Sequence, residues 1–205
     1  NATSLTITAA KGFGRTTIQD TDNKLTSVSI TGSDAVTTTD IGTTKTNSLA
    51  TVNVSAVKAL ALDAIGGNST KLDTVTLAST TKGITFTDSK LIGKTDNAVE
   101  LDVTLSAKEA ITTVNEIASA GTGVGIAIDS VKLGAISATS TDGLILIGNI
   151  GANATSMGDI TVSAKGNVTT GLIGNGTAKA TSVGTISMTS TDGYIDVDDI
   201  NVQDA

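Results

Sequence analysis

The chain has 205 residues, a formal net charge of −7 at pH 7, and neither cysteine nor histidine. Without cysteine it has no disulfide bond and no thiolate metal site, and without histidine it lacks the commonest general base and transition-metal ligand. The 13 basic residues are scattered, so there is no basic footprint for nucleic acid, and no apolar run approaches the roughly 18 residues of a membrane-spanning helix.

The hydrophobic residues are almost all small aliphatic ones, with one tyrosine, two phenylalanines and no tryptophan. This set predicts a thin core, because the large aromatic side chains that anchor a thick core are nearly absent. Threonine and serine make up more than a quarter of the chain, and the β-branched threonine favours strands. Proline is absent, which is typical of a chain whose strands are nearly all paired on both sides.

A six-residue pattern, apolar-x-x-apolar-x-apolar, recurs along the chain. Clear copies occupy residues 25–30, 49–54, 72–77, 133–138, 157–162 and 183–188, with a weaker copy at 2–7 and a distorted one at 103–105. Successive copies start roughly 23–26 residues apart, except around residues 92–132, where the spacing stretches. Self-similarity at this period predicts a solenoid, and the repeat is too short for a four-stranded propeller blade.

In chain order, each repeat of the first half predicts one pattern strand and one return strand. The expected strands are 3–8, 15–18, 25–30, 35–39, 49–54, 72–77 and 84–87. Residues 57–65 are rich in alanine and leucine, but their alternation and the following Gly66-Gly67-Asn68 favour a strand. Tight corners with positive φ are expected at Gly32, Gly83, Gly143, Gly166 and Gly193.

The second half contains the least and the most regular parts of the chain. Residues 92–132 form an irregular insertion, in which helix formers at 106–117 indicate either a short helix or an elongated return strand. Residues 133–143 match residues 183–193 at an offset of fifty. We expect the corners at Asp142-Gly143 and Asp192-Gly193 to stack two coils apart, with Lys165-Gly166 between them.

Apolar and polar residues alternate within each copy, so each strand buries one face. We predict an all-β fold, a parallel β-solenoid (β-helix) forming a single domain over 1–205. It would have about eight coils of roughly 23–26 residues, with an irregular coil at 92–132. The stacked copies would place these residues in one interior column, and their neighbours two residues on in a second: Val28, Val52, Val75, Ile136, Ile160 and Ile186.

The positions between the apolar residues would form ladders of hydroxyl groups on a flat outer face. The residues expected there are Thr74, Thr76, Ser137, Thr139, Thr161, Ser163, Ser187 and Thr189. Threonine and serine are soluble residues and threonine favours strands, so the pattern arises without any function. The functional interpretation is a surface that binds a regular lattice such as ice, although Asn53, Asp102 and Asp159 interrupt the array.

The acidic segment 192–199 suggests a Ca²⁺ site with Asp196, Asp198 and Asp199 as candidate ligands, because calcium takes hard oxygen ligands. Its spacing does not match an EF-hand, and a solvated acidic edge is the simpler explanation. For catalysis only carboxylate pairs are present, as in carbohydrate-active β-helices, and the aromatic sugar platforms of such enzymes are missing. We predict no enzyme activity, and calcium is the one candidate cofactor.

The segment 23–32, its relatives at 47–55 and 70–79, and the cysteine-free composition rich in threonine, alanine and glycine resemble bacterial surface-layer proteins and large secreted, RTX-associated repeat proteins. The resemblance implies parallel β-solenoids that assemble into lattices or stalks, often with Ca²⁺. The tandem Gly-Gly-x-Gly-x-Asp nonapeptides of that group are missing here. The pattern also resembles an irregular leucine-rich repeat, without its ladder of asparagine or cysteine.

We therefore expect an extracellular or cell-surface structural protein that self-assembles into a surface layer, sheath or filament. No signal peptide is recognisable, so we expect a processed protein or a segment of a longer one. The expected partner is the protein itself, with cell-surface polysaccharide as a further candidate. Nucleic acid and a membrane span are not expected. The alternatives are an adhesin stalk or binding module of a large secreted protein, and an ice-binding solenoid.

Overall fold

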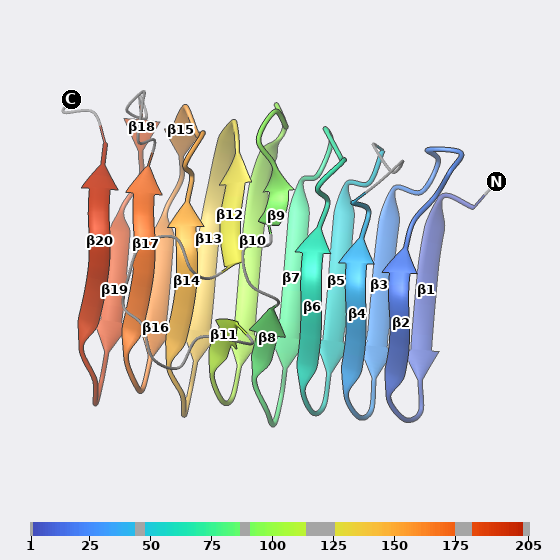
Figure 1. Cartoon of the computed structure of the whole chain (residues 1–205), viewed down its shortest axis with the longest axis horizontal. Coiled ribbons are helices and arrows are strands. Elements are labelled where there is room, and N and C mark those ends of the chain that lie inside the picture. Colours follow the sequence, from blue (N-terminus) through green and yellow to red (C-terminus); the bar gives the residue numbers. More distant parts are fainter. Residues whose placement is uncertain (1, 44–47, 87–90, 114–125, 175–181, 203–205) are drawn as a thin grey trace.

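In the computed structural model the chain forms a parallel β-solenoid. The structure describes residues 2–43, 48–86, 91–113, 126–174 and 182–202, and none of these residues is helical. Two sheets, A and B, face each other, and the chain alternates between them (Figure 1). We use the word level for one segment of sheet A together with the segment of sheet B that follows it in the chain. Eight levels are stacked from the N-terminus to the C-terminus and are joined in about seven turns, so the predicted fold class is confirmed.

Within the described residues each sheet contains ten strands, all in parallel pairs. Sheet A comprises β1 (Ser4–Ala9), β3 (Ser27–Gly32), β5 (Thr51–Ala56), β7 (Thr74–Ser79), β10 (Glu100–Ala107), β13 (Lys132–Ser140), β15 (Ser156–Met157), β16 (Ile160–Ala164), β18 (Ser182–Val183) and β19 (Ile186–Ser190). Sheet B comprises β2 (Phe13–Ile18), β4 (Val36–Ile41), β6 (Leu60–Ile65), β8 (Ile84–Phe86), β9 (Leu91–Lys94), β11 (Ile111–Thr113), β12 (Ile126–Ser130), β14 (Ile145–Ile150), β17 (Val168–Gly174) and β20 (Ile195–Asn201). The segment 57–65 is therefore a strand over Leu60–Ile65, as its alternation indicated.

Sheet A carries the six-residue pattern, and its apolar positions form two interior columns. The first column is Leu5, Val28, Val52, Val75, Val103, Ile136, Ile160 and Ile186. The second is Ile7, Ile30, Val54, Leu77, Leu105, Ala138, Val162 and Met188. On levels 2 to 7 these side chains are at most 2% exposed, so the predicted interior columns are confirmed.

Sheet B has an interior column that the sequence analysis did not identify. It consists entirely of isoleucine: Ile18, Ile41, Ile65, Ile92, Ile128, Ile150, Ile173 and Ile200. The six inner members are completely buried. A glycine follows five of the eight, and these recurrent Ile-Gly pairs in the return segments were the signal that could have revealed the column.

The irregular region is not helical where the structure describes it. Ser106 and Ala107 end β10, and Ile111–Thr113 forms β11, so the short-helix interpretation is wrong for residues 106–113. The rest of that segment, 114–117, lies outside the described residues. Both β11 and β12 pair with β14, so they lie on one level of sheet B, separated in the chain by residues 114–125. The extra residues therefore fall, in the sequence, between two strands of sheet B, while the strands of sheet A stay stacked.

The distorted copy of the pattern has one residue fewer than the others. Leu101 pairs with Leu133 and Val103 pairs with Ile136, so the register shifts between the two pairs. Leu101 is the buried first apolar residue of this copy, placed two residues before Val103 instead of three. This bulge returns the shortened copy to the register of its neighbours.

The glycines with positive φ are not the predicted ones. Among the described residues they are Gly42 (67°), Gly66 (69°), Gly93 (99°), Gly151 (71°) and Gly174 (95°), and each directly follows an isoleucine of the column. Gly32, Gly83, Gly143, Gly166 and Gly193 lie at the opposite corner and do not have positive φ. Close approach explains glycine there instead: a Cβ on Gly83 would lie 2.5 Å from the carbonyl oxygen of Ala110 on the next level.

Candidate functional site

The outer side of sheet A carries two continuous columns of small side chains, which together we call the hydroxyl face. The first column is Thr6, Ser29, Asn53, Thr76, Thr104, Ser137, Thr161 and Ser187. The second is Thr8, Thr31, Ser55, Ala78, Ser106, Thr139, Ser163 and Thr189. All are threonine or serine except Asn53 and Ala78, and none is charged, so the array is more continuous than the sequence pattern indicated.

Strand register assigns the predicted hydroxyl residues to different columns. The sequence pattern aligns Thr76 with Ser137, and the pairing agrees with it through Thr104. Thr74 belongs to a third outer column, where it pairs with Asp102. The other seven predicted residues all lie on the hydroxyl face. Asp102 therefore leaves the two main columns uninterrupted.

The hydroxyl face repeats in two directions. Along the solenoid its groups recur at the inter-strand spacing of about 4.8 Å, and across it they lie two residues, or about 7 Å, apart. The Oγ of Ser55 donates to Oγ1 of Thr31 at 3.3 Å, so hydroxyls of neighbouring levels contact each other. A shallow hollow over levels 2 to 4 is lined by Asn53 and Ala78 together with hydroxyl residues beside them.

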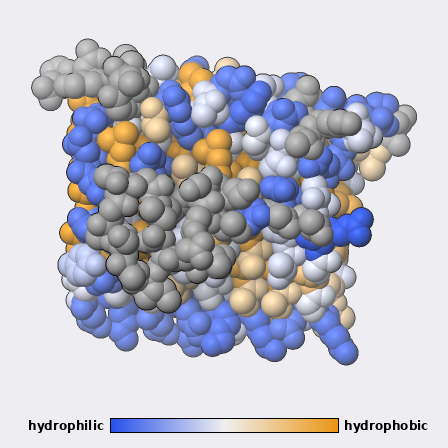
Figure 2. All heavy atoms as spheres, in the orientation of Figure 1, coloured by the Kyte–Doolittle hydropathy of each residue, from blue (hydrophilic) through white to orange (hydrophobic). Residues whose placement is uncertain are grey.

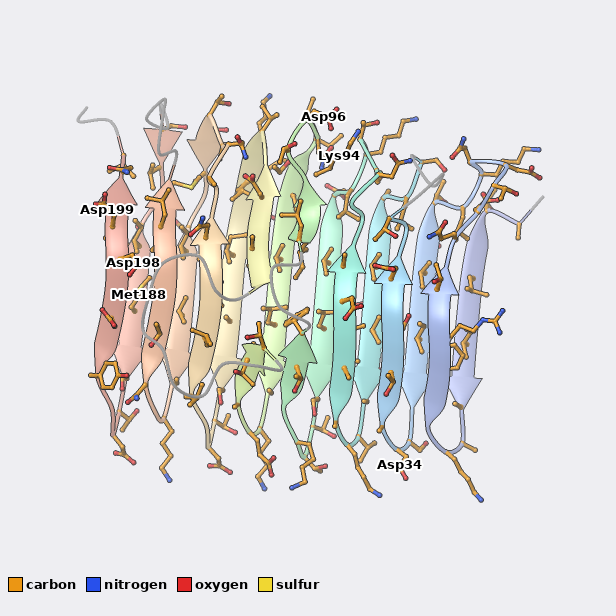
Figure 3. All side chains as sticks on the ribbon, in the orientation of Figure 1. Asp34, Lys94, Asp96, Met188, Asp198 and Asp199 are labelled. Atoms are coloured by element: carbon orange, nitrogen blue, oxygen red, sulfur yellow. The ribbon has the colours of Figure 1, made fainter. Side chains whose placement is uncertain are left out.

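Oppositely charged side chains of neighbouring levels pair at the corner where the chain leaves sheet A, which we call the charged corner. The Nζ of Lys58 lies 3.1 Å from a carboxylate oxygen of Asp34, and Nζ of Lys82 lies 2.7 Å from Oε1 of Glu109. This corner forms the lower edge in Figure 3, where Asp34 is labelled, and it is strongly hydrophilic in Figure 2. The hydrogen bond from Lys58, with a second from the N–H of Ala35, lowers the pKa of Asp34.

The matching segments 133–143 and 183–193 share a corner motif, Ser-Thr-Asp-Gly. The Oγ of Ser190 donates to the carbonyl oxygen of Gly166 at 2.9 Å and accepts from the N–H of Gly193 at 3.0 Å. Two levels earlier, Oγ of Ser140 likewise donates to the carbonyl oxygen of Glu109 and accepts from the N–H of Gly143. The N–H of Asp192 donates to the carbonyl oxygen of Lys165 at 2.8 Å. The predicted stacking of these corners around Lys165-Gly166 is thus confirmed.

The two ends of the solenoid expose the residues that continue the interior columns. At the C-terminal end, Tyr194 is 55% exposed and Ile195 and Ile200 are each 47% exposed. Met188, labelled in Figure 3, ends the second column of sheet A. At the N-terminal end, Leu5, Ile7, Phe13, Arg15 and Ile18 line an open hollow together with Thr17 and Gln19.

The candidate calcium ligands lie on the last strand. Asp196, Asp198 and Asp199 all belong to β20, and Asp198 and Asp199 are exposed (Figure 3). Oδ1 of Asp199 accepts from the N–H of Ile200 at 2.9 Å. Among the described residues, no group of three or more acidic, histidine or cysteine side chains is arranged to hold a metal ion. The calcium site stays a prediction.

Comparison with family models, with curated proteins and with solved structures finds no match to this chain. The resemblance to surface-layer and RTX-associated proteins therefore stays an expectation. Among the described residues, no helix has the length and hydrophobicity needed to cross a bilayer. The surfaces available for a function are the hydroxyl face, the charged corner and the two ends of the solenoid.

Proposed function

We propose that the protein is a non-catalytic structural building block of the cell surface or extracellular space, which self-assembles into a layer, sheath or filament. The observation that carries this proposal is the exposure of the apolar columns at the ends of the solenoid. Ile195 and Ile200 are each 47% exposed, whereas their column neighbours Val168 and Ile173 on the preceding level are 0% exposed. A further level placed on this end would give both isoleucines the environment of the inner levels.

Two physical effects favour such an addition. Fully burying an isoleucine side chain contributes about 1.5–3 kcal/mol, so each half-exposed isoleucine would gain about half of that, and several end residues would be buried together. The outer edges of β19 and β20 also have no strand beside them within the described residues, and an edge strand presents N–H and C=O groups ready to pair. An uncovered end of a stacked repeat array favours association for these reasons.

The hydroxyl face supports lateral contact in the same assembly. Its two columns carry no charge, so two such faces approach each other without burying unpaired ions. Closely spaced hydroxyls also suit cell-surface polysaccharide as a second partner, through hydrogen bonds in both directions.

The test is direct observation of the purified 205-residue chain. Negative-stain electron microscopy should show sheets or fibres, and sedimentation should show an average mass that rises with protein concentration. A chain that stays monomeric at high concentration contradicts the proposal. Such a monomer, if it binds surface polysaccharide, supports the alternative of an adhesin stalk.

The continuity of the hydroxyl face favours ice binding as a second candidate function. Its two columns extend over all eight levels with the two exceptions Asn53 and Ala78, as a surface matching a regular lattice requires. Measurement of thermal hysteresis decides the question. Activity abolished by Thr76→Tyr on this face, and retained in Thr37→Tyr on the outer side of sheet B, would establish it; absence of hysteresis in the folded protein excludes it.

A further inference from the structure

We propose that two copies join end to end in parallel register, β19 and β20 of one copy pairing with β1 and β2 of the next, and that Arg15 and Asp198 form the charge pair that sets this polarity. The inference rests on the proposed self-assembly and names its contact. Internal levels of the solenoid supply the template, because each is joined to the next in the same parallel register.

Apolar columns continue across the proposed junction without a break. In the register of the internal levels, Ile186 meets Leu5 of the next copy and Met188 meets Ile7. In sheet B, Ile195 meets Phe13 and Ile200 meets Ile18. The isoleucine column would thereby run from one copy into the next, and the exposed apolar residues at both ends would be buried together.

Arg15 occupies an interior column position on an otherwise apolar end. It pairs in register with Thr38, which is 1% exposed, and the same column ends in Val197 on the last level. Within the described part of the chain, the buried Oγ1 of Thr38 has no hydrogen-bond partner. A level stacked on this end would bury the guanidinium group of Arg15, which is strongly unfavourable unless a carboxylate pairs with it. An inward-pointing charge of this kind protects an edge strand from indiscriminate pairing.

The opposite end of the solenoid supplies the carboxylate. Asp198 follows Val197, and the residues that follow its column partners on the two preceding levels are Gly148 and Gly171. In the proposed register Arg15 of the next copy lies opposite Val197, one residue along the strand from Asp198. Only an end that carries an acid at this position accepts Arg15.

The remaining charges of the two end levels are also complementary. Residues 4–18 contain two basic residues, Lys11 and Arg15, and no acidic one; residues 182–202 contain four acidic residues and no basic one. At the charged corner, Asp34 pairs with Lys58 and Lys82 with Glu109 between neighbouring levels. The same corner would bring Asp192 next to Lys11 of the following copy. Complementary ends steer association and make it sensitive to salt.

Charge reversal tests the pair. Arg15→Asp places two acids at the junction and Asp198→Arg places two bases there, so each variant alone should associate at least about tenfold more weakly than the wild type in sedimentation velocity. An equimolar mixture of the two variants should assemble again as alternating copies, because each junction in the mixture then joins an acid to a base. This rescue also shows that both variants are folded. Lys71→Asp and Glu100→Arg make the same changes of charge on exposed residues of inner levels and should assemble like the wild type.

Cross-linking tests the register separately. The chain has no cysteine, and Thr189 and Thr8 lie in the same outer column on the last and first levels. With Thr8→Cys and Thr189→Cys together, the two Cα atoms across the junction would be about 4.8 Å apart, within the range of a disulfide. Oxidation should give a ladder of covalent oligomers. Ser55→Cys with Thr189→Cys, which moves one thiol to an inner level of the same column, should give no such ladder.

The outcomes separate this inference from the broader proposal. If the wild-type chain never associates, both fail. If it assembles but each charge variant alone assembles equally well, or the Thr8–Thr189 cross-link does not form, then the end-to-end junction is overturned and self-assembly through another surface, such as the hydroxyl face, remains.

Discussion

Ile65 is completely buried between Ile41 and Ile92, the neighbouring isoleucines in the all-isoleucine column of sheet B. The position directly precedes the corner at which the chain leaves the sheet, where Gly66 has positive φ. An isoleucine fits because its branched side chain packs along a stack of parallel strands and prefers few rotamers there. The column therefore helps to hold successive levels in register.

Shortening this side chain should be strongly destabilising. We expect Ile65→Ala to lower the free energy of unfolding by about 2–5 kcal/mol, because the rigid column cannot close over the lost volume. Urea denaturation of the variant measures the change. Thr37→Ala, at an exposed position on the outer side of the same sheet, should change the free energy by less than about 0.5 kcal/mol. Equal losses in the two variants would contradict the assignment of the column to the core.

Asp129 is a buried acidic residue near the end of β12, directly after Ile128 of the isoleucine column, with 3% of its surface exposed. At this position, directly after an isoleucine of the sheet B column, five other levels have a glycine with positive φ. Its carboxylate accepts hydrogen bonds from the N–H of Asn153 at 3.0 Å and from Nδ2 of Asn153 at 2.5 Å. Burial raises the pKa of Asp129, and the bonds from Asn153 and from the N–H of Ser130 oppose this rise.

The raised pKa predicts a specific pH dependence. The folded state holds the Asp129 proton more tightly than the unfolded state, so this residue's contribution to stability is fully present below its ordinary pKa of 3.8 and is lost as pH rises through the folded value. Asp129→Asn should therefore gain stability relative to the wild type as pH rises through that window, as measured by urea denaturation at several pH values.

Asp34 provides a control, because its pKa is shifted in the opposite direction to that of Asp129. Its pKa is lowered by Lys58, so its contribution is present above the ordinary value of 3.8 and is lost as pH falls through the lower folded value. Asp34→Asn should accordingly lose stability relative to the wild type as pH rises. Parallel pH profiles for the two variants would contradict both assignments.

At the scale of an element, the corner after sheet B is shaped by glycines with positive φ. Gly42 has a φ of 67°, and its N–H donates to the carbonyl oxygen of Ile18 at 2.9 Å. A Cβ at this position would also lie 2.5 Å from Cδ2 of Leu49. Backbone strain and steric contact therefore both require glycine here.

Two alanine substitutions distinguish this role from the general effect of removing glycine. Gly42→Ala should destabilise the protein by about 1–3 kcal/mol, because a residue with a side chain is strained at positive φ. Gly14→Ala, in β2, places its Cβ where no atom lies within 4 Å, and it should be neutral or slightly stabilising. Thermal unfolding of the two variants makes the comparison, and equal melting temperatures would contradict the proposed strain.

At the scale of the whole molecule, each level contacts only the levels above and below it. Stability in such an array is a sum of level and interface contributions, so the end levels, with one neighbour each, open first. Hydrogen exchange of the monomer should be slowest in β5 and β7 and fastest in β1, β2, β19 and β20. In assembled protein the four end strands should become protected as well. Uniform protection of the monomer would contradict this gradient.

Much of this architecture was predictable because apolar and polar residues alternate locally within each copy of the repeat. Val52, Val75 and Ile160 each recur at the same place in the pattern, and a period of two decides which side of a strand they bury. Parallel stacking at a fixed repeat length then aligns them in one column. The outward threonines followed from the same alternation, whereas the pairing showed that Asp102 lies outside the two main columns.

Register and corners were decided only by the tertiary structure. The shortened copy at 101–105 enters the register of its neighbours through the bulge between Leu101 and Val103, and pairing with the next level determines where that bulge lies. The path of the chain between the two sheets determines which glycines adopt positive φ. Gly42, at the corner after sheet B, has positive φ, whereas Gly83, at the opposite corner, does not. Alternation along the chain determined which side chains point inward and that the strands stack as a solenoid. Contacts between levels decided which residues meet, because such contacts join residues more than twenty positions apart and leave no local pattern in the sequence.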